Sequence, residues 1–219
     1  MINNSIAHKM GVNTDDVQNV KNIIFDLGGV IFNINYQSTI DAFKKLNFND
    51  FDMIYTKMKQ STLFDLLETG KIPPQTFRNE LRKYKSKLND AEIDFAWNAM
   101  IKDLPQANID LLMNIRSTYR IFLLSNTNAI HISYVVKYLE NNFGENIFPK
   151  LFEHVYYSHE IGLRKPHPDA YAFVLERSGL KPDETLFIDD LQANIDGAKE
   201  TGILSYHLDN ELITDIFNY

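Results

Sequence analysis

The chain has 219 residues, no cysteine and a formal net charge of -7 at pH 7. This length is sufficient for one substantial core, or for a core with a small accessory domain. The acidic balance and the scattered lysines argue against nucleic acid as a partner, because no basic stripe is available to neutralise phosphates. The lack of cysteine excludes disulfides and thiolate metal sites, and no apolar run is long enough to span a bilayer. We therefore expect a cytoplasmic protein with no membrane partner.

Residues 1–20 are polar and mixed in character, which predicts a loosely held N-terminal extension or a short helix. The next segment, 22–30, is an apolar strand that ends on Asp26 and turns through Gly28 and Gly29. In open parallel α/β sheets, ligands bind outside the carboxyl ends of the strands, and glycines let the backbone approach them closely. Asp26 is therefore placed for chemistry, although the same tetrapeptide could also be a simple turn.

Residues 37–104 lose the strand pattern and predict helices, with a break at Pro73 and Pro74. Apolar residues recur there at helical spacing, in the stripes Ile40, Phe43, Leu46 and Leu63, Phe64, Leu67. Arg78 and Arg82 lie one helical turn apart. They are interpreted as a solvated face in preference to groups that reach a substrate.

From residue 105 onward the alternation of strands and helices returns. An apolar strand before Ser125 and Asn126 and another before Asp189 and Asp190 both end in residues that can hold a ligand. A basic loop with Lys165 precedes a helical pattern. Further strands are predicted at 154–158 and 203–207, so this part reads as a parallel α/β unit.

These residue types suit phosphoryl transfer. A carboxylate such as Asp26 can attack phosphorus and form an aspartyl-phosphate, which divides a hard hydrolysis into two easier steps. Two anions must then approach each other, and Mg²⁺ held by carboxylates would reduce their repulsion. A lysine and a hydroxyl, Lys165 and Ser125, would hold the remaining phosphate oxygens.

With these residues in this order, the chain resembles the haloacid dehalogenase superfamily of hydrolases over nearly all of its length after residue 20. Its motifs are also similar to those of the bacterial glucose-1-phosphate phosphatase subgroup. They are Phe-Asp-Leu-Gly-Gly-Val at 25–30, Leu-Ser-Asn-Thr at 124–127, Gly-Leu-Arg-Lys-Pro at 162–166 and Ile-Asp-Asp-x-x-x-Asn at 188–194.

The resemblance implies a Rossmann-like parallel sheet, formed by residues 21–36 and 105–219, with an inserted helical cap at 37–104. It implies catalytic roles for Asp26 and Lys165 and phosphate binding by Ser125 and Lys165. The implied Mg²⁺ ligands are the side chains Asp26, Asp189 and Asp190 and the backbone carbonyl of Gly28. Glu68, at a helix end or loop of the cap, and Asn126 complete the expected substrate contacts, with Asn126 also interpreted as a support for its neighbours.

One departure concerns the proton that the leaving group needs. Most phosphatases of this superfamily have a second aspartate two positions after the nucleophile, and here that position is Gly28. Since general acid catalysis contributes about 10²–10⁴-fold, we expect a preference for acidic leaving groups, such as the anomeric hydroxyl of a sugar 1-phosphate.

Other functions remain open at this point. A 2-haloacid dehalogenase shares the aspartate nucleophile but needs no magnesium, which would leave Asp189 and Asp190 as repelling anions. A receiver domain uses similar groups in the opposite chain order. A third alternative is a protein that binds phosphate but has weak activity, because Gly28 stands where the general acid is usually found. The best interpretation is a magnesium-dependent phosphatase for a small phosphate ester such as a sugar phosphate; the oligomeric state is not indicated.

Overall fold

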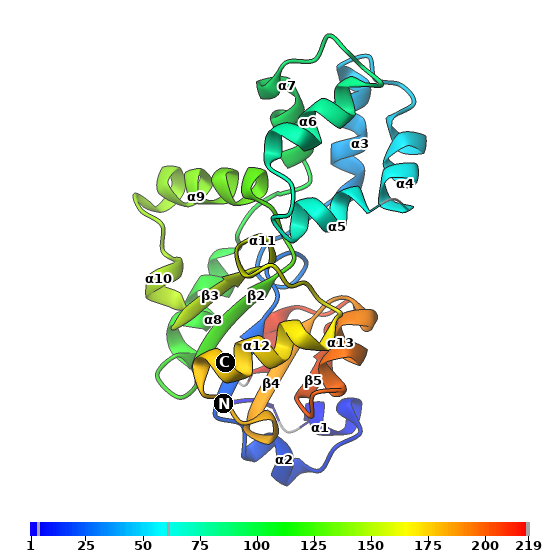
Figure 1. The fold of residues 1–219 in the computed structure, drawn as a ribbon. Helices are drawn as coiled ribbons and strands as arrows, with labels where there is room; N and C mark the ends of the chain where they lie inside the picture. Colours follow the sequence, from blue (N-terminus) through cyan, green and yellow to red (C-terminus); the bar gives the residue numbers. More distant parts are fainter. Residues whose placement is uncertain (4, 61, 218–219) are drawn as a thin grey trace.

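The computed structural model describes residues 1–3, 5–60 and 62–217. Within them, the strands form one parallel sheet in the order β3-β2-β1-β4-β5 (Figure 1). The strands are β1 Asn22–Phe25, β2 Arg120–Ser125, β3 His154–Tyr157, β4 Thr185–Asp189 and β5 Leu204–His207. The predicted α/β class with a parallel sheet is confirmed.

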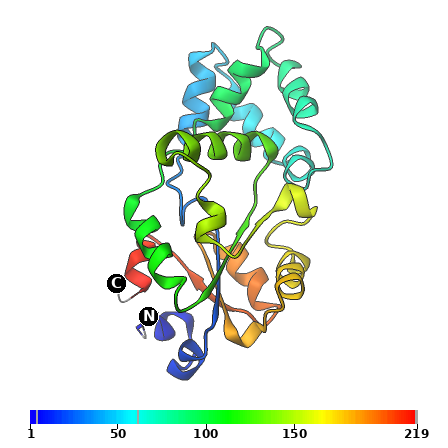
Figure 2. The same cartoon turned by 90° about the vertical axis from the view of Figure 1, so that its left-hand side faces the viewer.

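Helices cover both faces of the sheet, which explains why its central strands are continuous apolar runs. Successive residues of β1 alternate between the faces, so that Ile23 and Phe25 belong to one apolar cluster and Ile24 to another. Figure 2 shows the sheet between α8 on one side and α12 and α13 on the other. The helices of the core are α8 Gln106–Ile115, α9 Ala129–Phe143, α10 Phe148–Leu151, α11 Ser158–Ile161, α12 Pro168–Ser178 and α13 Gln192–Lys199, with 3-10 helices at Pro182–Glu184 and Ile213–Ile216.

The N-terminal residues pack against the core and are not a loose extension. They form two short helices, α1 Ser5–Met10 and α2 Thr14–Gln18. Ile2, Ile6 and Val17 are buried in the same cluster as Phe25. The backbone nitrogen of Asn3 donates a hydrogen bond to the carbonyl of Ile216 at 2.8 Å, which joins the two ends of the chain. These buried apolar side chains anchor the segment to the core despite its polar composition.

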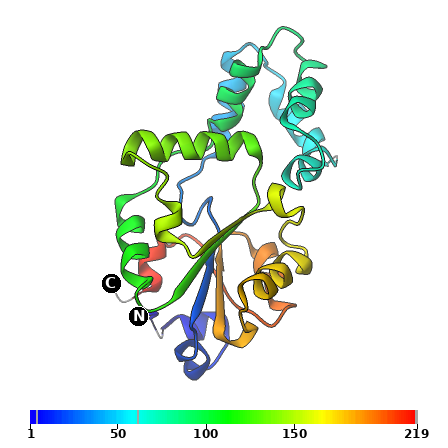
Figure 3. The ribbon, with the colours of Figure 1, turned by 60° about the vertical axis from the view of Figure 1, so that its left-hand side comes forward.

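A separate group of helices lies above the carboxyl ends of the strands (Figures 1 and 3). It comprises α3 Tyr36–Lys45, α4 Phe51–Gln60, α5 Leu63–Glu68, α6 Pro74–Arg82 and α7 Asp90–Asn98, called the helical unit below. The unit has its own apolar cluster, in which the rings of Phe43 and Phe51 stack with centroids 3.9 Å apart. A single residue of the core, Ile130 of α9, belongs to this cluster among the residues described.

Two connections join the helical unit to the core, and they pair with each other. The backbone nitrogen of Asn35 donates to the carbonyl of Met100 at 2.8 Å, and that of Asn33 donates to Asp103 at 2.9 Å. Lys102 returns a bond to the carbonyl of Asn33 at 3.0 Å. Both chain crossings are therefore held in one small antiparallel ladder.

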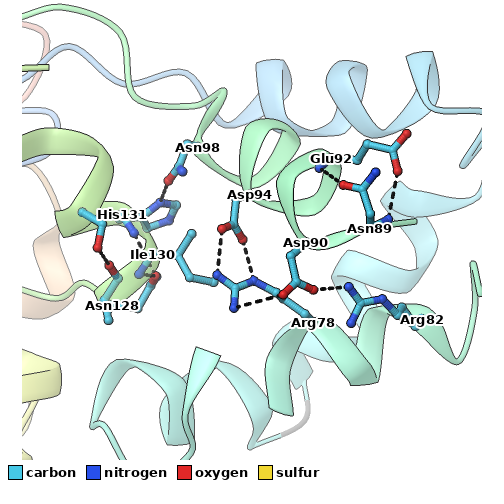
Figure 4. A network of polar contacts seen from close by, with 12 residues as sticks. Arg78, Arg82, Asn89, Asp90, Glu92, Asp94, Asn98, Asn128, Ile130 and His131 are labelled. Carbon is cyan, nitrogen blue, oxygen red and sulfur yellow. Dashed lines mark hydrogen bonds and ion pairs between the residues drawn. The ribbon is translucent and has the colours of Figure 1, made fainter. Parts of the chain in front are cut away.

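Neither interpretation offered for Arg78 and Arg82 is correct, since both guanidinium groups bind acidic residues of α7 (Figure 4). Arg78 donates to the two carboxylate oxygens of Asp94 at 2.8 and 2.7 Å. Arg82 pairs with Asp90 and also donates to the carbonyl of Leu88 at 2.7 Å. The sequence missed this role because the partners lie in the next helix, which is not a local neighbour.

No helix in the described part of the chain combines the length and the apolar character that a membrane crossing requires.

Candidate active site

Strand register brings the predicted site residues to one edge of the sheet. Phe25 of β1 pairs with Leu123 on one side and with Ile188 on the other. The next residue along, Asp26, donates its backbone N–H to the carbonyl of Ile188 at 3.0 Å. Asp26 and Asp189 are therefore neighbours on adjacent strands, at the carboxyl ends where ligands of α/β sheets bind.

The ammonium of Lys165 links these two carboxylates. Its Nζ lies 2.7 Å from Oδ1 of Asp26 and 2.6 Å from Oδ2 of Asp189, and the residue is 1% exposed. Burial by itself would lower the pKa of Lys165, but the charges of Asp189 and Asp26 raise it above the ordinary value. Lys165 therefore carries its positive charge inside the protein, which is favourable only because two anions face it.

Asp189 is fully buried and its carboxylate is saturated with donors. The side-chain amide of Asn194 donates to both oxygens, at 2.9 and 3.0 Å, and the backbone nitrogen of Leu191 donates to Oδ1 at 2.9 Å. With the bond from Lys165, the Asp189 carboxylate accepts four hydrogen bonds from three donor atoms. This set fixes the carboxylate that in turn orients Lys165.

Three carboxylates gather at this point against one ammonium. Ligand atoms of Asp26, Asp189 and Asp190 all lie within 4.8 Å of one another. Burial raises the pKa of Asp26 to about 7, with a contribution from Asp189 and opposition from Lys165. Burial and the charge of Asp189 also raise the pKa of Asp190. The excess of negative charge and the all-oxygen donors suit a hard divalent cation.

Ser125 is the last residue of β2 and Asn126 follows it at the same edge of the sheet; both line the cleft described below. The amide nitrogen of Asn126 donates to the carbonyl of Lys165 at 2.7 Å, and its oxygen accepts from the Lys165 backbone nitrogen at 2.9 Å. Asn126 thus holds the backbone that carries the lysine. Ser158, which the sequence did not single out, binds both backbone polar groups of Thr127 in a similar way.

The two glycines after Asp26 make different close contacts. A Cβ built on Gly28 would lie 3.3 Å from Cγ2 of Ile34, so Ile34 occupies the space beside this residue. Gly29 has a φ of +81°, and a Cβ there would lie 2.2 Å from Oδ2 of Asp190. Only glycine at position 29 permits the backbone to pass this close to the Asp190 carboxylate.

A cleft of about 550 Å³ separates this cluster from the helical unit. From the core it is lined by Asp26, Gly28, Ser125, Asn126, Arg164, Lys165, Asp190, Leu191 and Asn194, and from the helical unit and its connection by Ile34, Tyr36, Tyr55, Phe64, Asp65 and Glu68. All the predicted site residues line the cleft except Asp189, which lies beneath it.

Arg164 joins the two walls of the cleft, a role that the sequence did not reveal. Its guanidinium pairs with Asp65 and, at 3.0 Å, with Oε2 of Glu68, both from α5. Glu68 therefore faces the cleft as expected, but its carboxylate is bound to an arginine of the core. The basic loop around Lys165 held this signal, although nothing in the sequence identifies the partners.

The model of the haloacid dehalogenase-like hydrolase family matches residues 20–202. The chain belongs to this family. D-ribitol-5-phosphate phosphatase of Bacteroides thetaiotaomicron is 32% identical over 192 residues, 87% of this chain and 93% of the relative. Glyceraldehyde 3-phosphate phosphatase of Methanocaldococcus jannaschii is 26% identical, with 86% of this chain and 85% of that relative covered.

Solved structures agree with this family assignment. A family enzyme from Bacteroides thetaiotaomicron, in complex with magnesium and inorganic phosphate, has a TM-score of 0.81 and 37% identity, covering 91% of this chain and 100% of the other. L-2-haloacid dehalogenase of Xanthobacter autotrophicus has a TM-score of 0.58 at 22% identity, covering 86% of this chain and 77% of the other. The second likeness is one of fold alone. The glucose-1-phosphate phosphatase subgroup is not among these relatives.

The contact between Gly29 and Asp190 can be tested against a matched glycine. Gly144 has a φ of +79° and open space around it, so alanine there carries only the backbone cost of about 1–2 kcal/mol. Gly29→Ala adds a clash with Asp190, and we expect its free energy of unfolding to fall by roughly 1–3 kcal/mol more than that of Gly144→Ala. Denaturant unfolding of both variants measures the difference; equal losses would show that the carboxylate moves aside freely.

Proposed function

We propose that this protein is a magnesium-dependent phosphatase that hydrolyses a small sugar or sugar-alcohol phosphate through an aspartyl-phosphate on Asp26. The observation that carries the proposal is the buried Lys165, bound to Asp26 and Asp189 at the edge of a cleft of about 550 Å³. The names of the relatives support the ester class, since they are phosphatases of small phosphorylated metabolites.

In this proposal Asp26 attacks phosphorus, and Lys165 stays beside it throughout. The lysine neutralises the carboxylate before attack and is close enough to contact a phosphate bound next to Asp26. Ser125 donates its hydroxyl to a second phosphate oxygen, and Asn126 holds the loop that carries Lys165. Asp189 acts through Lys165, because its oxygens are occupied by Lys165, Asn194 and Leu191.

The same residues fit a magnesium ion. Asp26 and Asp190 would supply carboxylate oxygens to one cation, and Gly28 would add its backbone carbonyl. Asp189 belongs to the same group of carboxylates, but its oxygens already accept four hydrogen bonds, so it would bind the cation only in exchange for one of them. The single ammonium leaves two of the three carboxylates uncompensated, and that excess is what raises the pKa of Asp190 along with burial. When bound, Mg²⁺ supplies the positive charge that lets an anionic phosphate approach an anionic nucleophile.

We propose that the predicted insertion 37–104, which the structure forms as the helical unit beginning at Tyr36, is a cap that selects the substrate, while the remainder of 21–36 and 105–219 forms the catalytic core. Its α5 places Glu68 in the cleft, and Arg164 fixes that helix to the core. With α5 held against the core in this way, the cap would shield a bound phosphate from water, which would strengthen the interaction of the phosphate with charged groups.

The two candidate types of substrate differ in the leaving group of the ester. Gly28 led us to expect a sugar 1-phosphate, whose anomeric oxygen departs easily. The two phosphatase relatives are instead named for D-ribitol 5-phosphate and glyceraldehyde 3-phosphate. Both compounds are phosphate esters of primary alcohols. We therefore include primary esters in the proposed class, which requires a proton source other than residue 28.

A 2-haloacid dehalogenase is the competing activity. Its reaction needs no metal, so three carboxylates with one lysine would remain an unbalanced group. A weakly active phosphate-binding protein is the other alternative. Phosphate release from a panel of esters, with a haloacid as control, distinguishes all three.

Asp26→Asn should abolish turnover, by at least about 10³-fold, because the amide has the same shape but cannot attack phosphorus. Thermal unfolding should show a folded protein. Phosphate release is the measurement, and a variant that keeps its activity would exclude Asp26 as the nucleophile.

Chelation should stop phosphate release, and added Mg²⁺ should restore it, whereas Ca²⁺ should substitute poorly because its looser coordination spoils the geometry of attack. Mg²⁺ should also raise the melting temperature of the wild type but not of Asp190→Ala, since a ligand stabilises only a state that binds it. Asp196→Ala, on the exposed side of α13, is the control and should respond like the wild type. Full activity in excess chelator would favour the dehalogenase.

Glu68→Ala should change the order of substrates. If Glu68 binds a substrate hydroxyl, kcat/KM for D-ribitol 5-phosphate should fall roughly 10- to 100-fold, the range of one hydrogen bond to a charged group. p-Nitrophenyl phosphate has no such hydroxyl and should be affected little. Glu80→Ala on α6, paired with Lys83, is the control; an equal loss on both esters would mean that Glu68 acts through cap stability alone.

A further inference from the structure

A phosphatase with glycine at position 28 must obtain the leaving-group proton from another residue. Ile34 lies beside Gly28, with Cγ2 at 3.3 Å and Cδ1 at 3.4 Å from the position of a Cβ. A carboxylic acid side chain does not fit there without a shift of Ile34. The backbone continues from Ile34 to Tyr36, the first residue of α3.

Tyr36 lines the cleft that contains the proposed reacting groups. Its side chain lines the cleft together with Asp26, Asp190 and Lys165, and it also lines the adjoining cavity with Gly28 and Ser125. The residue is 52% exposed, although it is a large aromatic side chain. The paired connections 33–35 and 100–103 fix the start of α3, so Tyr36 has a defined place between core and cap.

The Tyr36 hydroxyl also has no partner in the described part of the protein, which leaves it available to a ligand. By contrast, several other tyrosine hydroxyls bind protein groups: Tyr119, Tyr138, Tyr156, Tyr171 and Tyr206. Although Tyr36 is about half exposed, the part of its side chain within the cleft is partly desolvated and close to the charges of Asp190 and Asp26, which together raise the pKa of the phenol. The phenol therefore keeps its proton at neutral pH.

We propose that Tyr36 donates the proton to the departing alcohol, in place of the acid that is absent at Gly28. This inference rests on the proposed phosphatase function. As an Asp26 oxygen bonds to phosphorus, the bond from phosphorus to the ester oxygen breaks, and that oxygen leaves with the electron pair and takes the Tyr36 proton. In the second step, water attacks phosphorus and gives one proton to the tyrosinate, while the electron pair of the acyl-phosphate bond returns to Asp26.

Other titratable groups around the cleft are less suited. The carboxylates of Asp65 and Glu68 are both paired with the guanidinium of Arg164. His131 lines the adjoining cavity, but burial lowers its pKa to about 3. Its Nδ1 lies 2.8 Å from the Oδ1 of Asn98, so this ring nitrogen is already engaged within the protein (Figure 4).

Tyr55 supplies a matched control, since it is a second cleft tyrosine with no hydrogen bond from its hydroxyl in the described structure. The charge acting on Tyr55 is that of Glu68 in the cap, whereas Asp190 and Asp26 of the core act on Tyr36. Replacement of either tyrosine by phenylalanine removes one oxygen from the same cleft.

The test measures kcat/KM for D-ribitol 5-phosphate and for p-nitrophenyl phosphate in the wild type, Tyr36→Phe and Tyr55→Phe, with Mg²⁺ present. This constant includes every step up to departure of the alcohol. The p-nitrophenolate anion is stable enough to leave without a proton, so we expect kcat/KM for its ester to change less than about threefold in Tyr36→Phe. For the ribitol ester, whose alkoxide needs a proton, we expect kcat/KM to fall by about 10²-fold or more. Tyr55→Phe should keep the wild-type ratio of the two constants.

An equal loss on both esters in Tyr36→Phe would overturn the proposal, because it would indicate a structural role. An unchanged ratio in that variant, or the same selective loss in Tyr55→Phe, would also overturn it. Failure of the proposed function is a separate result: the wild type would then release phosphate from neither ester. Mg²⁺ and inorganic phosphate should raise the melting temperature of Tyr36→Phe by the same amount as that of the wild type.

Discussion

The rest of the site depends on the buried ammonium of Lys165 between Asp26 and Asp189. A charge this deeply buried is stable only with anionic partners, and two carboxylates at this edge of the sheet are stable only with a cation. The lysine lies on a loop before α12, while its partners end β1 and β4. One ammonium therefore fixes the relative positions of three segments that are far apart in the sequence.

Close backbone packing keeps those segments together. Asn126 binds both backbone polar groups of Lys165, and Asn194 holds Asp189 from α13. A Cβ on Gly197 would lie 2.0 Å from the carbonyl oxygen of Pro166, so α13 lies directly against the loop of Lys165. Small residues and side-chain amides thus position the segments that carry the charged groups of the site.

The cleft itself is formed by two units with separate apolar cores. The paired connections join them at one side, and the ion pairs of Arg164 with Asp65 and Glu68 join them at the other. Tyr36 and Glu68 of the helical unit line the same cleft as Asp26 of the core. In the mechanism that we propose, substrate selection and proton donation would take place at the boundary between the units, whereas attack on phosphorus would take place in the core.

The sequence by itself determined the α/β class and the group of Asp26, Ser125, Lys165 and Asp190, because a strand that ends on a polar residue delivers it to the carboxyl edge of a parallel sheet. It did not determine the packing of residues 1–20 or the partners of Arg78 and Arg82. Only the tertiary structure decided those features. It also decided the pairing of Arg164 with α5 and the position of Tyr36 in the cleft. Each is a contact between segments distant in sequence, and local periodicity carries no information about which distant side chain completes a charge or fills a gap.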